Sequence, residues 1–292
     1  MNGLLLIDKP VGPTSHDLVN QARRWCQARQ IGHTGTLDPL ASGLVILCVG
    51  WATRLSEYLL GHDKRYLAQI RFGQATDTYD AEGRPTATST QLPSLESIQA
   101  ALPHFQGAIQ QVPPAFSAIK KDGQPLYKAA RRGEMLEIPA RTVTIFGLEV
   151  LAWQAPDLHL AVHCGAGTYI RSLAHDLGQK VDCPAHLAAL QRTHIGEFSL
   201  EQAHTPSAYQ QASQAATLSH WLLPADRAVS HLPAVYVNEW EYRRLCNGGV
   251  VALHAGNLHG EVRLYTAEGA FFAIGRADSN LRTLQPQKVL VS

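Results

Sequence analysis

The stretch IGHTGTLDPLASGLVILCVG, residues 31–50, joins a polar loop to an apolar run. Residues 43–50 are apolar over the length of a buried strand. Residues 32–43 hold three glycines and one carboxylate, Asp38. Glycines allow a backbone to approach a ligand closely. The stretch therefore predicts a strand preceded by a loop that could present Asp38 to a ligand.

The residues before this stretch complete a small folding unit. Residues 3–7, GLLLI, predict a buried strand that ends in a Pro/Gly turn. Thr14 and Asp17 have capping-box spacing, which predicts a helix over 15–29. The predicted order of this unit is strand, helix, loop and strand. We expect the loop to lie at the edge of a sheet, where functional loops are common.

Further elements are predicted by the spacing of apolar residues and by the residues that begin or end helices and strands. Alternation predicts strands at 64–73, 142–153 and 158–165. Ser94 predicts the start of a short helix, residues 167–181 a helix that closes at Gly178, and residues 202–222 a helical connector. From about residue 232, short strands between Gly, Asn and Asp turns predict a small all-β module.

Composition limits the possible classes. The chain has 292 residues, 45% of them apolar, which allows one large domain and a small one. A formal charge of +1 does not by itself indicate a nucleic-acid partner. Five widely spaced cysteines favour a reducing compartment. The first residues lack the pattern of a signal peptide, and no apolar run reaches about 20 residues, so we expect a cytoplasmic protein with no membrane partner.

One segment is locally basic. Between residues 112 and 141, six cations face three acidic residues, a net charge of +3, with Phe116 and Tyr127 interleaved. Such a segment suits an RNA backbone. The ordinary alternative is a solvated helix face. The cations are Lys120, Lys121, Lys128, Arg131, Arg132 and Arg141.

Four side chains are candidates for a site, and each has a structural alternative. Asp38 precedes Pro39, a pairing typical of an N-cap and the first residue of a helix. His33 either contacts a nucleotide or bonds within its own turn. Tyr66 lies in a predicted strand, where core packing is the default. Arg171 lies at a strand-to-helix junction, where it is either exposed or a charge partner in a cleft.

Other motif classes are weak or missing from the sequence. Cys183 and His186 are one pair of possible metal ligands, but no further ligands lie nearby, so we do not expect a metal. No P-loop, dinucleotide fingerprint or GxSxG nucleophile motif occurs.

Six blocks together resemble the bacterial tRNA pseudouridine-55 synthase family, TruB, over almost the whole chain. The block at 31–50 is the most specific. At two positions, His175 and Gln191, the chain departs from residues frequent in the family. The blocks are LLLIDKPVGPTS (4–15), IGHTGTLDPLASGLVILCVG (31–50), KRYLAQIRFG (64–73), VPPAFSAIKKDGQPLYKAARRGE (112–134), GTYIRSLAHDLG (167–178) and LQRTHIGEF (190–198).

The resemblance implies an α+β fold, the pseudouridine synthase fold. A mixed, mainly antiparallel central sheet would be flanked by helices and loops, followed by a small C-terminal all-β PUA-like domain. Residues 1–231 would form the catalytic domain, with an RNA-clamping insertion, the thumb, at about 112–141. Residues 232–292 would form the PUA-like RNA-binding domain.

The resemblance also implies a reaction, the conversion of uridine 55 in the T loop of tRNA to pseudouridine without metal or other cofactor. Asp38 matches the catalytic aspartate, Arg171 the arginine that pairs with it, and Tyr66 the tyrosine that stacks on the target base. Leu190 matches an apolar residue of the pocket, and His33 a histidine that helps to flip the nucleotide out. Such flipping is needed because the base is otherwise inside a folded arm.

The expected partner is the T arm of tRNA. The related H/ACA-guided synthases lack the thumb, so we expect this chain to find its RNA without a guide RNA, and to act as a monomer. The expected RNA contacts, besides His33 and Leu190, are Lys9, Lys120, Lys128, Arg131, Arg132 and Arg141.

Two other functions stay open at this stage. The chain could be an RNA-binding or tRNA-folding protein whose catalysis is secondary, because flipping a T-loop nucleotide already opens tertiary contacts. A carboxylate glycosidase is weaker, since it needs a second catalytic acid beside Asp38 and the matched motif offers an arginine.

Overall fold

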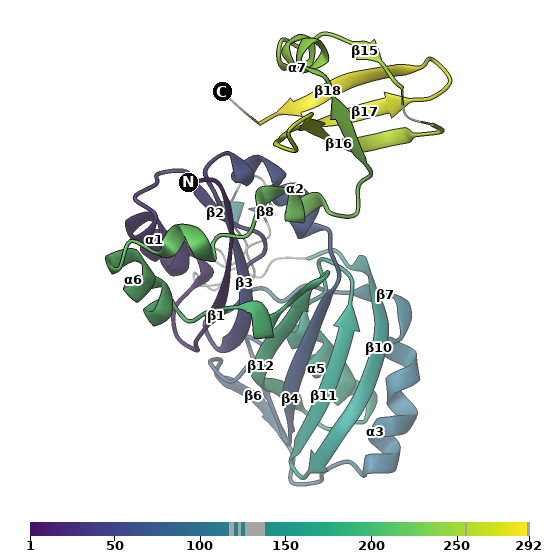
Figure 1. Ribbon diagram of the computed structural model, residues 1–292. Helices are drawn as coiled ribbons and strands as arrows, with labels where there is room; N and C mark the ends of the chain where they lie inside the picture. Colours follow the sequence, from purple (N-terminus) through teal and green to yellow (C-terminus); the bar gives the residue numbers. More distant parts are fainter. Residues whose placement is uncertain (117–119, 122–123, 126–137, 255, 291–292) are drawn as a thin grey trace.

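The computed structural model of the chain describes residues 1–116, 120–121, 124–125, 138–254 and 256–290. It shows a large mixed sheet with flanking helices and, beyond α2 (Ser56–Leu60), a smaller C-terminal sheet (Figure 1). Within the described residues, no helix combines the length and apolarity needed to cross a bilayer.

The large sheet has the strand order β1-β3-β12-β4-β11-β10-β7, with β2 paired to β3 and β13 paired to β12. Among its described pairs, only β3 with β12 is parallel, which confirms the predicted mixed, mainly antiparallel α+β fold. The strands are β1 (Gly3–Lys9), β2 (Ile31–His33), β3 (Ala41–Val49), β4 (Lys64–Phe72), β7 (Gly107–Gln111), β10 (Arg141–Gln154), β11 (Asp157–Cys164), β12 (Ala185–Ile195) and β13 (Phe198–Ser199).

The strand β12 was not predicted from the residue pattern, although it lies in the middle of the sheet. Its first half, AHLAA, does not alternate, and two register shifts interrupt its pairing with β4. These bulges change which side chains face inward, so the period of two is lost. In the sheet, β12 lies between β3, which follows Asp38 in the sequence, and β4, which carries Tyr66. Leu190 and Arg192 of β12 therefore lie between these two strands.

The expectation that the Asp38 loop lies at the edge of a sheet is wrong. The strand β1 pairs with β3 along residues 43–49, so β2 and β12 share the other side of β3. β2 pairs with residues 47–49 and β12 with residues 41–43. The loop at 34–40 therefore lies inside the sheet, between the part of β3 that pairs with β2 and the part that pairs with β12.

Helices cover the sheet in two groups. α1 (Ser15–Trp25) and α6 (Pro206–Gln214) pack together beside β1, and Trp25 stacks on Tyr209 at 5.7 Å (Figure 1). α3 (Leu95–Ala101) and α5 (Ile170–Lys180) pack behind the other half of the sheet.

The helix boundaries partly confirm the sequence analysis. The capping box of Thr14 and Asp17 is present. However, α1 ends at Trp25, since Gln27 has a φ of 49°. α5 continues past Gly178, whose missing side chain serves packing: a Cβ there would lie 2.7 Å from the Ala185 Cβ.

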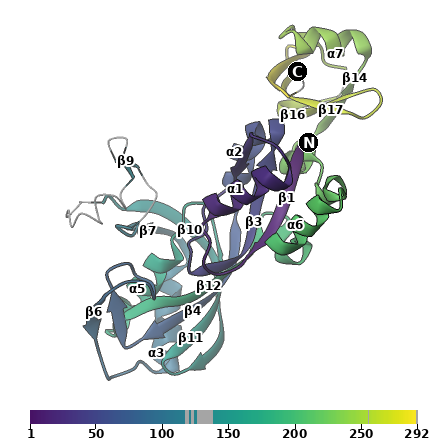
Figure 2. The ribbon, with the colours of Figure 1, turned by 90° about the vertical axis from the view of Figure 1, so that its left-hand side faces the viewer.

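Smaller elements complete the body. β5 (Gln74–Thr76) pairs with β6 (Pro85–Thr88) at the end of the molecule far from the C-terminal sheet (Figure 1). The short pair β8 (Lys120–Lys121) and β9 (Gln124–Pro125) stands away from the body on the side of β7 (Figure 2). Short 3₁₀ helices span Gly50–Leu55, Leu102–Phe105, Leu200–Gln202, Leu218–Trp221 and Ala225–Val229.

The C-terminal sheet has the order β14-β16-β17-β18-β15 and a hydrophobic core of its own. The strands predicted in this region are present, together with one strand (β18) and one helix (α7) that were not. The Asn238 cap of α7 forms a capping box with Glu241 that the sequence analysis overlooked. The elements are β14 (Ala234–Val237), α7 (Glu239–Cys246), β15 (Val251–Ala252), β16 (His259–Thr266), β17 (Phe271–Asp278) and β18 (Thr283–Val289).

Candidate active site

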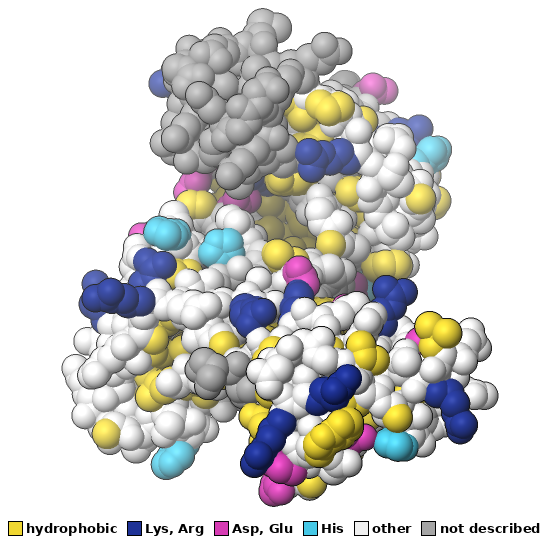
Figure 3. Space-filling view, turned by 90° about the horizontal axis from the view of Figure 1, so that it is seen from above, with side chains coloured by type: hydrophobic (Ala, Val, Ile, Leu, Met, Phe, Trp, Pro, Cys, Tyr) yellow, Lys and Arg dark blue, Asp and Glu magenta, His cyan; other side chains and the backbone are white. Residues whose placement is uncertain are grey.

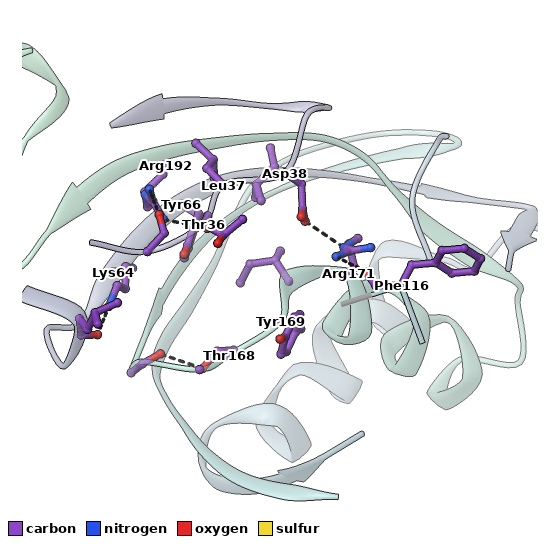
Figure 4. A pocket seen from close by; sticks show the side chains of 16 residues that line it. Thr36, Leu37, Asp38, Lys64, Tyr66, Phe116, Thr168, Tyr169, Arg171 and Arg192 are labelled. Atoms are coloured by element: carbon purple, nitrogen blue, oxygen red, sulfur yellow. Dashed lines mark hydrogen bonds and ion pairs between the residues drawn. The ribbon is translucent and has the colours of Figure 1, made fainter. Parts of the chain in front are cut away.

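A cavity of about 570 Å³ opens over the centre of the large sheet. Its lining includes Asp38, Tyr66, Arg171 and Leu190, which come from four separate parts of the sequence. In Figure 4, Asp38 and Arg171 meet at one end and Tyr66 lies toward the other. The structure thus brings together the carboxylate, the cation, the aromatic ring and the apolar residue singled out from the sequence.

The Asp38 loop is held by buried side chains from elsewhere in the chain. The Ser15 hydroxyl accepts a hydrogen bond from the Leu37 N–H at 2.9 Å. The Lys9 ammonium donates to the Ala41 carbonyl at 2.6 Å. Asp38 itself begins a turn, with its carbonyl accepting from the Ala41 N–H. No helix follows Pro39, so the N-cap interpretation of Asp38 is wrong.

The Asp38 carboxylate is paired with Arg171, as the sequence comparison implied. Arg171 Nε lies 3.0 Å from Asp38 Oδ2, although its N–H is not aligned for a hydrogen bond. Burial raises the pKa of Asp38 above its usual value, and the charge of Arg171 opposes this rise. The pair therefore keeps an anion available in a place where burial alone would favour the neutral acid.

Arg171 also contacts a second carboxylate that the sequence analysis missed. Its Nη1 lies 3.3 Å from Oδ2 of the buried Asp80, and its Nη2 donates to the Phe116 carbonyl at 3.1 Å. Asp80 is fixed in turn by the Thr78 hydroxyl at 2.6 Å. Asp80 and the Phe116 carbonyl thus hold the two terminal nitrogens of the guanidinium, and its Nε lies next to Asp38.

Tyr66 and Leu190 come from adjacent antiparallel strands. Leu190 pairs with Ala68 and Arg192 with Tyr66 in the register of β12 and β4. Tyr66 is 9% exposed, and burial raises its pKa while Arg192 opposes the rise. Its ring provides a flat apolar surface, as stacking of a nucleobase requires.

Two predicted RNA contacts have different surroundings from those expected. Lys9 is 0% exposed and its ammonium is used by backbone carbonyls, so its prediction as a direct RNA contact is wrong. Burial lowers its pKa to about 8. His33 accepts from the Gly35 N–H at 3.4 Å, which agrees with the turn interpretation, and it does not line the cavity. A role of His33 in nucleotide flipping stays a prediction.

The thumb prediction falls largely outside the described residues. Lys128, Arg131 and Arg132 are not described, and Lys120 is described only as part of the strand β8. Arg141 begins β10, opposite Gln111, and is exposed. The RNA contacts proposed for these five residues stay predictions.

The lining includes further residues that were not singled out from the sequence, among them Lys64, Tyr169 and Arg192. Lys64 donates to the Leu60 carbonyl at 2.8 Å, and burial lowers its pKa to about 8. Tyr169 is held through its backbone by the Gln111 side chain. Arg192 reaches the cavity from β12. The alternation of charged and apolar residues in β4 could have placed Lys64 on the face of Tyr66.

Two family models match the chain. The model of the TruB family pseudouridylate synthase N-terminal domain matches residues 23–170, and that of the tRNA pseudouridylate synthase B C-terminal domain matches residues 171–230. The chain belongs to the TruB family of pseudouridylate synthases. This agrees with the family indicated by the sequence blocks.

Curated relatives in the TruB family match over the full length. The tRNA pseudouridine synthase B of Actinobacillus succinogenes is 41% identical over 294 residues, which cover 99% of this chain and 94% of the relative. The protein of the same name from Aromatoleum aromaticum is 43% identical over 290 residues, covering 99% and 93%.

Solved structures are also similar over the full length. A chain from an H/ACA ribonucleoprotein bound to a substrate RNA containing 2′-deoxyuridine has a TM-score of 0.75 and 25% identity, covering 99% of this chain and 85% of that one. A chain from an archaeal box H/ACA Nop10–Cbf5 complex has a TM-score of 0.73, 25% identity and coverage of 99% and 86%.

Proposed function

We propose that this chain isomerises uridine 55 in the T loop of tRNA to pseudouridine, with Asp38 as the catalytic carboxylate after the nucleotide has been flipped into the cavity. The observation that carries the proposal is the Asp38–Arg171 ion pair facing Tyr66 and Leu190 in one cavity. The curated names of the full-length relatives support the same reaction.

The reaction needs a site that keeps hold of a detached base. The N1–C1′ bond breaks, a C5–C1′ bond forms, the C5 proton is lost and N1 gains a proton, so electrons balance without an oxidant. Three routes are open to Asp38: attack on C1′, attack on C6, or removal of a 2′ proton. In each, Tyr66 stacks on the uracil, and the walls of the cavity limit access of water.

Arg171 would keep Asp38 ionised and oriented. An unpaired buried carboxylate is costly and takes up a proton instead. Tyr66 is a candidate to accept the C5 proton, but burial raises its pKa, so it needs help from a neighbour. No metal or other cofactor is required by this scheme.

A glycosidase is disfavoured by the position of the second carboxylate. Two catalytic acids would flank the bond to be cleaved. Asp80 instead lies behind the Arg171 guanidinium and does not line the cavity.

The RNA would be held by surfaces on either side of the cavity. We propose that residues 112–141 clamp the T arm as the thumb, and that residues 232–292 form a PUA-like domain that extends the contact beyond the catalytic domain, 1–231. Lysine and arginine side chains spread over the face seen from the C-terminal sheet, with acidic groups between them (Figure 3). Such dispersed cations suit contacts to separate phosphates.

The proposal includes a cytoplasmic monomer that needs no guide RNA. The deciding experiment incubates the purified chain with an unmodified tRNA transcript and no other RNA, and then maps pseudouridine. We expect modification at uridine 55. Modification elsewhere would refute the assigned position, and activity only with an added guide RNA would refute self-sufficient recognition.

The variant Asp38→Asn separates the isomerase from an RNA-folding protein. Its side chain has nearly the same size but carries no negative charge. We expect no pseudouridine and unchanged tRNA binding, and conversion at the wild-type rate would refute the role of Asp38. If tRNA refolding is accelerated equally by the wild type and Asp38→Asn, RNA folding is a second activity that does not depend on catalysis.

A further inference from the structure

Arg192 is a buried cation with no acidic partner in the described part of the chain. It is 2% exposed, and none of the ion pairs between described residues includes it. A buried charge without compensation is costly, so dipoles must take the place of a carboxylate. The dipoles here are backbone carbonyls: Nε donates to Leu44 O at 2.7 Å, and the two terminal nitrogens donate to Gly35 O and Thr36 O at 3.3 and 3.5 Å.

These carbonyls lie on both sides of Asp38, two in the loop before it and one in β3 after it. Gly35 and Thr36 lie just before Asp38, and Leu44 lies just after the loop, in β3. Backbone pairing of Arg192 with Gly43 holds the same point. One side chain thus fixes the start and the end of the loop with respect to β12.

The same guanidinium contacts the aromatic wall of the cavity. Arg192 and Tyr66 are partners in the register of β12 and β4, both line the cavity, and the charge of Arg192 lowers the pKa of the Tyr66 phenol against the effect of burial. Figure 4 shows the two side chains meeting at the end of the cavity opposite Asp38 and Arg171. A planar guanidinium with five donors can serve several acceptors at fixed angles, which an ammonium cannot.

We propose that Arg192 is a positioning residue of the reaction, which ties the Asp38 loop and the Tyr66 phenol into one rigid unit. It sets the placement of the carboxylate relative to the ring on which the uracil stacks. The inference rests on the proposed function. It assigns Arg192 no contact with the substrate.

The test uses Arg192→Lys, which keeps the positive charge but loses the planar guanidinium and its fixed arrangement of hydrogen-bond donors. A displacement of about 1 Å at a reacting group lowers rates on the order of 100-fold. We therefore expect a single-turnover rate lower by about that factor, with unchanged affinity for tRNA. Deuterium at C5 of the target uridine gives a further readout: a displaced phenol slows removal of the C5 proton, so the isotope effect should exceed that of the wild type.

The matched control is Thr193→Ala. Thr193 is the next residue of β12, donates one hydrogen bond to the Arg65 carbonyl, and lines a groove other than the active-site cavity. We expect a wild-type rate and isotope effect. The proposal is overturned if Arg192→Lys keeps the wild-type rate, if Thr193→Ala shows the same loss, or if the isotope effect does not change.

A second variant covers the case in which Arg192→Lys does not fold, as judged by its thermal unfolding. Tyr66→Phe keeps the stacking ring and removes only the hydroxyl whose placement we assign to Arg192. We expect it to bind tRNA normally and to lose turnover, and a wild-type rate would overturn the inference. The wild-type protein in the same assay reports on the proposed function itself, because a wild type that forms no pseudouridine refutes that function rather than the role of Arg192.

Discussion

Asp38 is subject to two opposing effects. Burial raises its pKa, while the adjacent Arg171 favours the ionised form. Arg171 is itself shared with Asp80, so the three groups form one chain of charge, in which Arg171 and Asp80 are buried and the Asp38 side chain is 33% exposed. Removing one member of such a chain leaves the charge of its neighbour without a partner. The free-energy cost of that unpaired charge exceeds the stabilisation that the original pair contributed.

We predict that Arg171→Ala abolishes most turnover and leaves tRNA affinity nearly unchanged. The physical reason is that Asp38 becomes misaligned and takes up a proton. Loss of a precise geometry costs on the order of 100-fold in rate. Single-turnover kinetics and a binding titration measure the two effects.

The matched control is Arg71→Ala, which breaks an exposed Arg71–Asp157 pair of 2.7 Å outside the cavity and should leave the rate unchanged. A loss confined to affinity contradicts the prediction.

We also predict that the reaction rate falls at acidic pH. The protonated form of Asp38 is inactive, so the rate should rise with pH through a midpoint above the usual pKa of 3.8, because burial raises the pKa. In Arg171→Ala the opposing charge is gone, and the residual activity should show a midpoint at still higher pH. The measurement is the single-turnover rate across acidic to neutral pH. Equal midpoints in the two proteins would mean that Arg171 does not tune Asp38.

At the scale of elements, β3 and β12 determine whether the cavity exists. Their parallel contact covers only residues 41–43 and 190–192. At Gly43 the two backbones approach so closely that a Cβ would lie 2.3 Å from the Arg192 carbonyl oxygen, and the φ of Gly43 is +104°. This contact fixes the Asp38 loop over β12.

We predict that Gly43→Ala destabilises the fold by about 2 kcal/mol or more, since crowding adds to an unfavourable backbone conformation. Urea unfolding measures the change. Gly12→Ala is the control, because Gly12 has a similar φ of +113° and nothing within 4 Å of an added Cβ. We expect a smaller loss there, from backbone strain alone. Equal losses would show that the close approach at Gly43 does not matter.

Some elements follow from the sequence and others do not. The apolar runs of β1 and β3 and the capping box of α1 act locally, and each was predicted. The strand β12 was missed because its bulges disturb the alternation of side chains. Gly178 was interpreted as a helix end, whereas it lies within α5 to admit Ala185, a contact between segments that no local pattern encodes.

At the scale of the whole molecule, the C-terminal sheet is fastened to the body through α2 and the 3₁₀ helix Gly50–Leu55 that precedes it. The Tyr58 hydroxyl donates to Glu261 Oε1 at 2.9 Å, Lys288 pairs with Glu57, and Arg54 donates to the Val289 carbonyl. Ile274 and Leu290 also belong to a hydrophobic cluster that includes Leu6 of β1 and Ile46 of β3. The C-terminal sheet therefore packs directly against the body.

We predict that Tyr58→Phe loosens the C-terminal sheet without unfolding the body. Loss of one hydrogen bond of about 1 kcal/mol increases local opening roughly fivefold. Hydrogen exchange of the amides in β16 should accelerate while that in β4 stays unchanged. The control is Tyr236→Phe, which alters a 64% exposed tyrosine of the same sheet whose ring stacks on Tyr265. Equal acceleration in both variants would remove Tyr58 from this role.

The sequence by itself determined the family and the local elements with clear periodicity, and it singled out Asp38, Tyr66, Arg171 and Leu190, which line one cavity in the structure. These signals are carried by short motifs and by the residues next to them. Only the tertiary structure decided that Lys9 is buried, that Asp80 stands behind Arg171, and that Arg192 binds carbonyls on both sides of Asp38 from a position opposite Tyr66. The reason is physical: burial, charge pairing and close backbone approach depend on segments far apart in the chain, so they exist only once those segments have packed together.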